Sequence, residues 1–138
     1  MKYNYALYVV ILATLSGCFT VRSNKQFSYS KIPVQQYANA LNTDTPYYLI
    51  DVRTSGEYRK AHIKNAHNYD FLAFHFDRDV DTLKRNIPAF IYCHTCHRSP
   101  FAARIMKRKG FKTVYDLKGG FSQWLKASLP VDTGVAVP

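Results

Sequence analysis

Two cysteines and an arginine in the second half of the chain could carry covalent thiol chemistry. Cys93, Cys96 and Arg98 belong to the run Cys-His-Thr-Cys-His-Arg-Ser. The apolar run 89–92 before it is typical of a strand buried on both faces of a parallel sheet. A helical pattern begins at Ser99. We therefore expect Cys93 to end a strand, and residues 94–98 to form a loop that leads into a helix.

The helix after this loop has clear end signals. Ser99 suits the N-cap, Pro100 the first helical position and Gly110 the position after the last turn. The N–H groups of a helix start favour an anion, and so does the cation Arg98. A thiol in such surroundings ionises more readily than a free cysteine. Cys93 is the expected nucleophile, and the simpler alternative is that it is only a small buried core residue.

The N-terminus differs from the rest of the chain. Lys2 is followed by the apolar run 6–15 and then by Leu-Ser-Gly-Cys, which ends at Cys18. The run is too short to cross a bilayer, which takes about 20 residues, and it is typical of an export signal. We expect a signal peptide over 1–17, a tether over 18–28, a domain over 29–130 and a flexible tail over 131–138.

Length and charge narrow the classes of function. The 138 residues suit one domain, and an apolar content of 47% is enough for a core. The net charge of +10 could favour anionic lipid or an anionic substrate, although an excess of basic residues is more often a solvated face. No interleaved aromatic and basic residues suggest a nucleic-acid groove, so we expect no nucleic-acid partner.

Strand and helix patterns alternate along the chain, which predicts an α/β domain with a parallel sheet. Ligand sites of such sheets lie at the carboxyl ends of the strands, where Asp51 and Cys93 both fall. The expected strands are 27–32, 47–52, 89–92 and 113–117, and residues 63–68 are expected to form a further strand or an extended turn. The expected helices are 34–41, a short one from Ser55, a weak one over 72–83, one from Ser99 and 121–127.

Several sequence blocks together resemble a known family. They are Leu49-Ile50-Asp51-Val52-Arg53, Glu57-Tyr58, Ala61-His62-Ile63, Cys93 to Ser99, and Leu117-Lys118-Gly119-Gly120 with Trp124. In this combination, residues 29–129 resemble a single rhodanese domain. The resemblance implies a three-layer α/β fold, in which a five-stranded parallel sheet is flanked by helices on both faces.

The resemblance also implies an activity. Rhodaneses are sulfurtransferases that carry sulfane sulfur as a cysteine persulfide, here on Cys93, from a small anionic donor such as thiosulfate to a thiol acceptor. Arg98 would bind the donor, and Asp51 and Arg53 would support the loop. The loop that cradles the sulfur would comprise His94, Thr95, Cys96, His97, Arg98 and Ser99. No cofactor and no metal are implied. Four residues separate Cys93 from Arg98, whereas the related dual-specificity phosphatases have five residues between their cysteine and arginine. The resemblance therefore favours a sulfurtransferase over a phosphatase.

The Leu-Ser-Gly-Cys ending resembles the lipobox of bacterial lipoproteins. This resemblance implies cleavage before Cys18 and attachment of lipid to that cysteine. The protein would then be lipid-anchored at a membrane of the bacterial cell envelope, on its extracytoplasmic side, facing the periplasm in a Gram-negative cell.

The chain departs from the rhodanese pattern at three places. Ala61 stands where glycine is usual, and Lys64-Asn65 replaces Pro-Gly, although Asn tolerates a left-handed turn. Cys96 replaces the loop glycine, which can adopt backbone angles that cysteine resists. Of the three departures, Cys96 is the one that bears on the shape of the sulfur cradle.

The two cysteines leave other interpretations open. Cys93 and Cys96 could form a thiol–disulfide or redox-sensing pair, and such a disulfide would gate sulfur transfer. The run Cys93 to His97 also spells the Cys-x-x-Cys-His motif of haem attachment, and a zinc site would need more ligands than this run offers. A catalytically idle rhodanese used as a binding module is a further alternative.

Overall fold

A computed structural model describes residues 26–134 of the chain. The predicted signal peptide 1–17, the lipidation site Cys18 and most of the predicted tether 18–28 lie outside these residues. The strands are β1 (Ser28–Ile32), β2 (Tyr48–Asp51), β3 (His62–Ile63), β4 (His67–Asn68), β5 (Ala89–Tyr92), β6 (Thr113–Leu117) and β7 (Val131–Asp132). The helices are α1 (Val34–Leu41), α2 (Ser55–Lys60), α3 (Phe76–Asp79), the 3₁₀ turn η1 (Val80–Thr82), α4 (Ser99–Arg108) and α5 (Gly120–Lys126).

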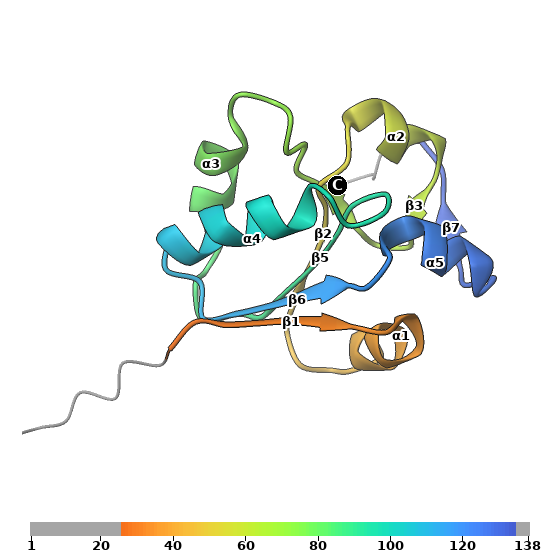
Figure 1. Cartoon of the computed structure of the whole chain (residues 1–138), viewed down its shortest axis with the longest axis horizontal. Coiled ribbons are helices and arrows are strands. Elements are labelled where there is room, and N and C mark those ends of the chain that lie inside the picture. The colour runs from red at the N-terminus through yellow and green to blue at the C-terminus, as the bar shows by residue number, and fades with distance from the viewer. Residues whose placement is uncertain (1–25, 135–138) are drawn as a thin grey trace, which may run out of the picture.

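Five strands form one parallel sheet in the order β1-β6-β5-β2-β4 (Figure 1). The central strand β5 is buried along its whole length, as its apolar run predicts. Asp51 at the end of β2 pairs with Tyr92 at the end of β5, so Cys93 follows at the same edge of the sheet. The predicted fold class is confirmed, and Asp51 and Cys93 lie at the carboxyl ends of their strands, as the sequence predicts.

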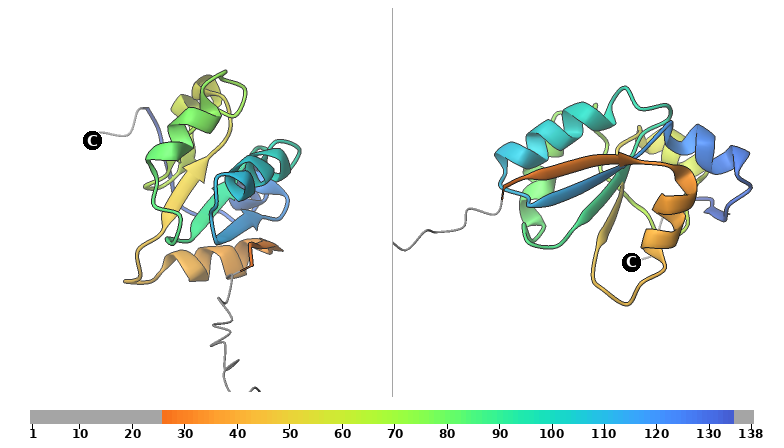
Figure 2. Two further views of the ribbon diagram at one scale, coloured as in Figure 1. Left: turned by 90° about the vertical axis from the view of Figure 1, so that its left-hand side faces the viewer. Right: turned by 60° about the horizontal axis from the view of Figure 1, so that its bottom comes forward.

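Each face of the sheet has its own apolar core. Ile50 and Ile91 pack with Met106 of α4 and Phe76 of α3 on one face. Leu49 and Phe90 lie on the other face with Tyr37 of α1, Tyr58 of α2 and Trp124 of α5. This alternation follows from the period of two along a strand. Figure 2 shows α1 and α4 on opposite sides of the sheet.

Residues 63–68, predicted as a strand or an extended turn, contain parts of two short strands in different sheets with a turn between them. β4 joins the main sheet beside β2, whereas β3 pairs with β7 in an antiparallel ribbon. The chain turns between them at Asn65, whose φ of 64° is the left-handed conformation that asparagine tolerates. Asn65, which stands where the family usually has glycine, therefore adopts the left-handed turn that asparagine was expected to tolerate.

The C-terminal segment also differs from the expectation. Val131–Asp132 forms β7, so this part of the predicted flexible tail 131–138 is ordered. The indole N–H of Trp124 donates to the carbonyl of Pro130 at 2.9 Å and holds the chain beside β3. Of the weak helix predicted over 72–83, only α3 and η1 form.

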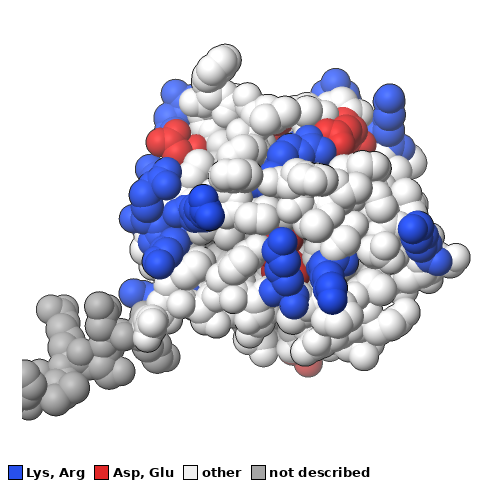
Figure 3. All heavy atoms as spheres, viewed as in Figure 1, with Lys and Arg blue, Asp and Glu red and all other residues white. Residues whose placement is uncertain are grey.

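Basic side chains gather at the end of the molecule where α4 ends (Figure 3). Lys107 and Arg108 lie in the last turn of α4, and the amine of Lys107 stands 5.7 Å from the centre of the Phe27 ring, beside the start of β1. Cys93 lies at the opposite, N-terminal end of α4, so this basic end is separate from the loop that follows Cys93. None of the helices within residues 26–134 has the length and apolar character needed to cross a membrane.

Candidate active site

Cys93 stands at the turn from β5 to α4, where only 1% of the residue is exposed. Its sulfur accepts a hydrogen bond from the backbone N–H of Cys96 at 2.8 Å. The hydroxyl of Ser99, the first residue of α4, lies 3.5 Å from the same sulfur. A negative charge on the sulfur would therefore be met by a backbone donor and by the start of a helix.

The loop closes around the sulfur because Cys96 adopts a left-handed backbone with φ of 102°. This conformation places its N–H toward Cys93, and it is the conformation expected for a position where the family has glycine. A residue with a side chain adopts it only at a cost of order 1–3 kcal/mol. Cys96 thus adopts the backbone conformation typical of glycine, and the loop still closes around the Cys93 sulfur.

The N-terminus of α5 holds the loop through two backbone hydrogen bonds. The N–H of Phe121 donates to the carbonyl of Cys93 at 2.8 Å, and the N–H of Ser122 donates to the carbonyl of His94 at 3.1 Å. Gly120 allows this approach, since a Cβ there would lie 2.5 Å from the Cys93 carbonyl oxygen. The sequence predicts a chain break at Gly119-Gly120, but it does not predict the contact of Gly120 with the loop after Cys93.

Arg98 makes a bidentate ion pair with Glu57 of α2. Its two terminal nitrogens donate to the two carboxylate oxygens at 2.6 and 2.8 Å. Glu57 also closes a capping box with Thr54, which fixes the carboxylate at the start of α2. Hydrogen bonding from Arg98 is the main reason that the pKa of Glu57 falls from 4.5 to about 2. Arg98, expected as the main anion contact, thus lies at the loop but is already engaged with a carboxylate.

Asp51 and Arg53 form a buried ion pair behind the loop. Arg53 donates to Asp51 through Nε at 3.0 Å and through a terminal nitrogen at 2.6 Å, and the same terminal nitrogen donates to the carbonyl of Ala61 at 2.6 Å. Its guanidinium stands 4.0 Å from the centre of the Phe121 ring. Because Phe121 bonds the Cys93 carbonyl, the expected support of the loop by Asp51 and Arg53 is indirect.

A buried carboxyl group, that of Asp116 in β6, lies near Ser99. Asp116 of β6 accepts a hydrogen bond from the hydroxyl of Tyr29 at 2.6 Å and is fully buried. Burial raises the pKa of Asp116, and hydrogen bonding from Tyr29 and Ser99 partly opposes the rise. The sequence offered no signal for this group other than a charged residue in an otherwise apolar strand.

The remaining loop side chains face solvent. His94, Thr95 and His97 are exposed, and the Thr95 hydroxyl lies 3.0 Å from Nδ1 of His97. Within residues 26–134, no group of three or more His, Cys, Asp or Glu side chains is arranged to hold a metal ion. Both Cys93 and Cys96 are free thiols in this structure.

The arrangement defines a class of protein: a parallel α/β domain with a buried, hydrogen-bonded thiol at a strand-to-helix turn. Residues 33–127 match the family described as "Rhodanese-like domain". The chain therefore belongs to the rhodanese-like family. The resemblance inferred from its sequence blocks is confirmed for this domain.

Curated relatives include both sulfurtransferases and a sulfur carrier. The chain is 30% identical to "Thiosulfate sulfurtransferase GlpE" of Vibrio cholerae over 98 residues. The matched segment covers 69% of this chain and 88% of that protein. It is 30% identical over 102 residues to "Putative sulfur carrier protein YrkF" of Bacillus subtilis, which covers 74% of this chain. The chain spans only 54% of the length of the Bacillus protein.

Solved structures share the fold. A rhodanese-related protein from Thermoplasma volcanium superposes with a TM-score of 0.66 at 22% identity, over 75% of this chain and 98% of that one. A thiosulfate sulfurtransferase from Pseudomonas aeruginosa gives a TM-score of 0.68 at 23% identity, over 81% of this chain and 21% of that one. At such identities the likeness concerns the fold alone.

Proposed function

We propose that this protein is a sulfurtransferase that carries sulfane sulfur as a persulfide on Cys93. The observation that carries the proposal is the hydrogen bond of 2.8 Å from the Cys96 N–H to the Cys93 sulfur, at the start of α4. Such a donor stabilises a thiolate before the reaction and a persulfide after it. The thiosulfate sulfurtransferase among the relatives supports the same activity.

The reaction would proceed in two displacements. The Cys93 thiolate attacks the outer sulfur of thiosulfate, the S–S bond of the donor breaks, and sulfite leaves with the bonding electrons. A thiol acceptor, as its thiolate, then attacks the outer sulfur of the persulfide and releases Cys93 as a thiolate. No oxidant or reductant is consumed, and the acceptor departs as a persulfide.

Arg98 would bind the anionic donor even though it is paired with Glu57. A guanidinium has five N–H donors, and the bidentate pair with Glu57 uses one on each terminal nitrogen. Three donors are left for an anion at the mouth of the loop. Glu57 would then act as the group that holds the guanidinium in place.

Intact mass spectrometry of the reduced protein after treatment with thiosulfate tests this function. We expect a gain of one sulfur atom in the wild type and none in Cys93→Ser, with loss of transfer to cyanide in the same variant. No gain of mass in the wild type would contradict the proposal and would favour a binding module.

A redox pair of Cys93 and Cys96 is the second candidate, favoured by the same short contact between the two residues. Disulfides need α-carbons about 4.4–6.8 Å apart, which two residues three positions apart on a bent loop can reach. The mass measurement separates the two functions, because a disulfide removes two hydrogens from the reduced protein and adds no sulfur.

We also propose that Cys18 is lipidated and anchors the protein to the bacterial envelope on the extracytoplasmic side. The basic end of α4 supports this, since it lies beside the start of β1 and would face anionic headgroups. We expect Cys18→Ser to release the protein from the membrane fraction. Unchanged retention, with no lipid on the mature N-terminus, would refute the anchor.

A further inference from the structure

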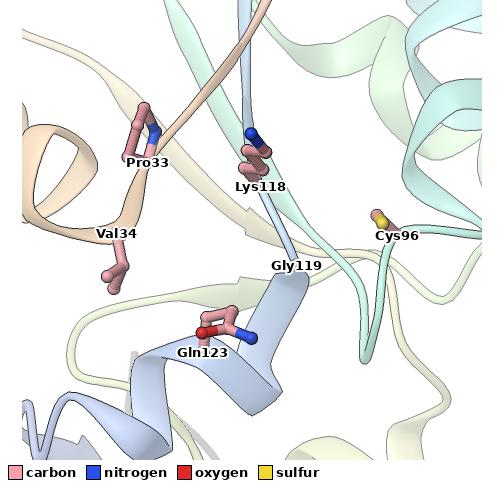
Figure 4. A pocket seen from close by; sticks show the side chains of 6 residues that line it. All are labelled: Pro33, Val34, Cys96, Lys118, Gly119 and Gln123. Atoms are coloured by element: carbon pink, nitrogen blue, oxygen red, sulfur yellow. The ribbon is translucent and has the colours of Figure 1, made fainter.

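A cavity at the carboxyl ends of β1 and β6 borders the catalytic loop through Cys96 (Figure 4). Its volume is about 440 Å³. Its walls are formed by Pro33, Val34, Cys96, Lys118, Gly119 and Gln123. A thiol with an organic body would fit into such a space, which is far larger than a thiosulfate or cyanide ion needs.

The two cysteines differ in their access to this cavity. Cys93 is 1% exposed and faces into the loop, whereas Cys96 is half-buried and lines the cavity. The N–H of Cys96 lies 2.8 Å from the Cys93 sulfur, and three covalent bonds separate that nitrogen from the Cys96 sulfur. The two sulfur atoms are therefore near neighbours, and only one of them belongs to the cavity wall.

We propose that Cys96 is a second sulfur-carrying residue, which takes the sulfane sulfur from Cys93 and presents it to a thiol bound in the cavity. The inference rests on the proposed function of Cys93. It gives Cys96 a role that the usual glycine at this position could not have, and it accounts for a side chain at a position with φ of 102°.

The added step is a balanced exchange. The Cys96 thiolate attacks the outer sulfur of the Cys93 persulfide, a new S–S bond forms at Cys96, and the bond to Cys93 breaks with Cys93 leaving as a thiolate. The acceptor thiolate then attacks the outer sulfur on Cys96, which leaves in turn as a thiolate. The choice of the outer sulfur matters, because attack on the inner one would give a disulfide and hydrosulfide.

The cavity walls indicate the chemical class of the acceptor. Pro33 and Val34 form an apolar wall of the cavity. Lys118 adds a positive charge, and within residues 26–134 it forms no ion pair with an acidic side chain. Gln123 adds an amide that can donate or accept a hydrogen bond. A small alkyl thiol that carries a carboxylate matches this set.

The first experiment compares two acceptors in the wild type, Cys96→Ser and Cys96→Gly. Cyanide is small enough to take sulfur from Cys93 directly, whereas 3-mercaptopropionate probes the cavity. We expect the ratio of kcat/KM for the thiol to that for cyanide to fall about tenfold or more in both variants. A ratio equal to that of the wild type in both variants would overturn the relay.

Using a ratio removes any general effect of the substitutions on the loop. If both variants lose transfer to cyanide as well, peptide mapping of the wild type decides. After loading with thiosulfate and alkylation, we expect persulfide on Cys93 and on Cys96. Sulfur confined to Cys93 at all loading times would overturn the relay while leaving the proposed function intact, and absence of persulfide from both cysteines would refute the proposed function itself.

Lys118→Ala tests the acceptor class. We expect KM for 3-mercaptopropionate to rise at least about fivefold, with little change in KM for the uncharged 2-mercaptoethanol. Lys126→Ala, at an exposed lysine of α5 outside the cavity, is the matched control. An equal effect on both thiols, or no effect on either, would contradict recognition of a carboxylate by Lys118.

Discussion

Glu57 and Arg98 are 41 residues apart in the chain and form a bidentate ion pair beside the loop that follows Cys93. The pair joins the start of α2 to the start of α4, because Glu57 belongs to the capping box of one helix and Arg98 is the N-cap residue of the other. The position of the loop therefore depends on a contact between two helices on different sides of the β2–β5 pair.

Replacement of Glu57 with glutamine should make stability less dependent on pH. The pKa of Glu57 is lowered from 4.5 to about 2, so the folded state gains stability from its charge above pH 4.5 and loses it as the pH falls toward 2. We expect Glu57→Gln to lower the free energy of unfolding by about 1 kcal/mol at pH 6, a small value because the pair is partly exposed. Urea unfolding at pH 6 and at pH 2 measures both effects. An equal loss at both pH values would contradict the ion-pair explanation.

Replacement of Arg98 should impair reaction with the donor. We expect Arg98→Ala to reduce kcat/KM for thiosulfate by 10²–10³-fold, as for loss of a preorganised donor. Arg98→Lys should restore little of this loss, because an ammonium cannot hold Glu57 through a bidentate pair and bind an anion at the same time. Steady-state kinetics with thiosulfate and cyanide measure the effect. Near wild-type activity in Arg98→Lys would refute the need for a planar guanidinium with several N–H donors.

A side chain at Gly120 should disturb the loop. A Cβ there would lie 2.5 and 2.6 Å from the carbonyl oxygens of Cys93 and His94, in addition to the cost of its φ of 65°. We expect Gly120→Ala to cost more than about 2 kcal/mol of stability and to lower activity about tenfold or more. Gly110→Ala is the matched control, because its φ is 88° but nothing lies within 4 Å of the added Cβ. Equal losses of stability and activity in both variants would show that the positive φ, and not contact with the loop carbonyls, causes the effect.

The buried pair of Asp51 and Arg53 should be sensitive to removal of one partner. We expect Arg53→Met to lower the free energy of unfolding by about 3–5 kcal/mol, because it leaves a buried carboxylate without its cation. The double variant Asp51→Leu, Arg53→Met should recover part of this loss. Denaturant unfolding of the single and double variants measures the coupling, and strictly additive losses would show that the charge pair is not the cause.

Oxidation should switch off transfer to cyanide. A disulfide between Cys93 and Cys96 would block the nucleophile, and we expect the wild type to be active with a reductant and weak without one. Cys96→Gly should lose this dependence on reductant, because no partner thiol is left. Equal rates of transfer to cyanide by the wild type in oxidising and reducing buffer would show that the two cysteines do not gate the reaction.

The sequence by itself determined the fold class and the position of Cys93. The nearly all-apolar run 89–92 favours burial, and a helix signal directly after the loop places Cys93 at a strand-to-helix turn. Both features depend on short-range chemistry, which a single sequence displays. The resemblance to the rhodanese family, rather than local chemistry, marked Cys96 as unusual, and its φ of 102° is the kind of backbone angle that glycine adopts easily.

Only the tertiary structure decided which distant groups meet at the site. Glu57 reaches Arg98, Phe121 bonds the carbonyl of Cys93, and Val131–Asp132 pairs with β3. The cavity beside Cys96 also exists only because the ends of β1 and β6 come together with α5. Such contacts join segments far apart in the chain, and their distances depend on how the helices pack on the two faces of the sheet. No local pattern of residue types encodes that packing.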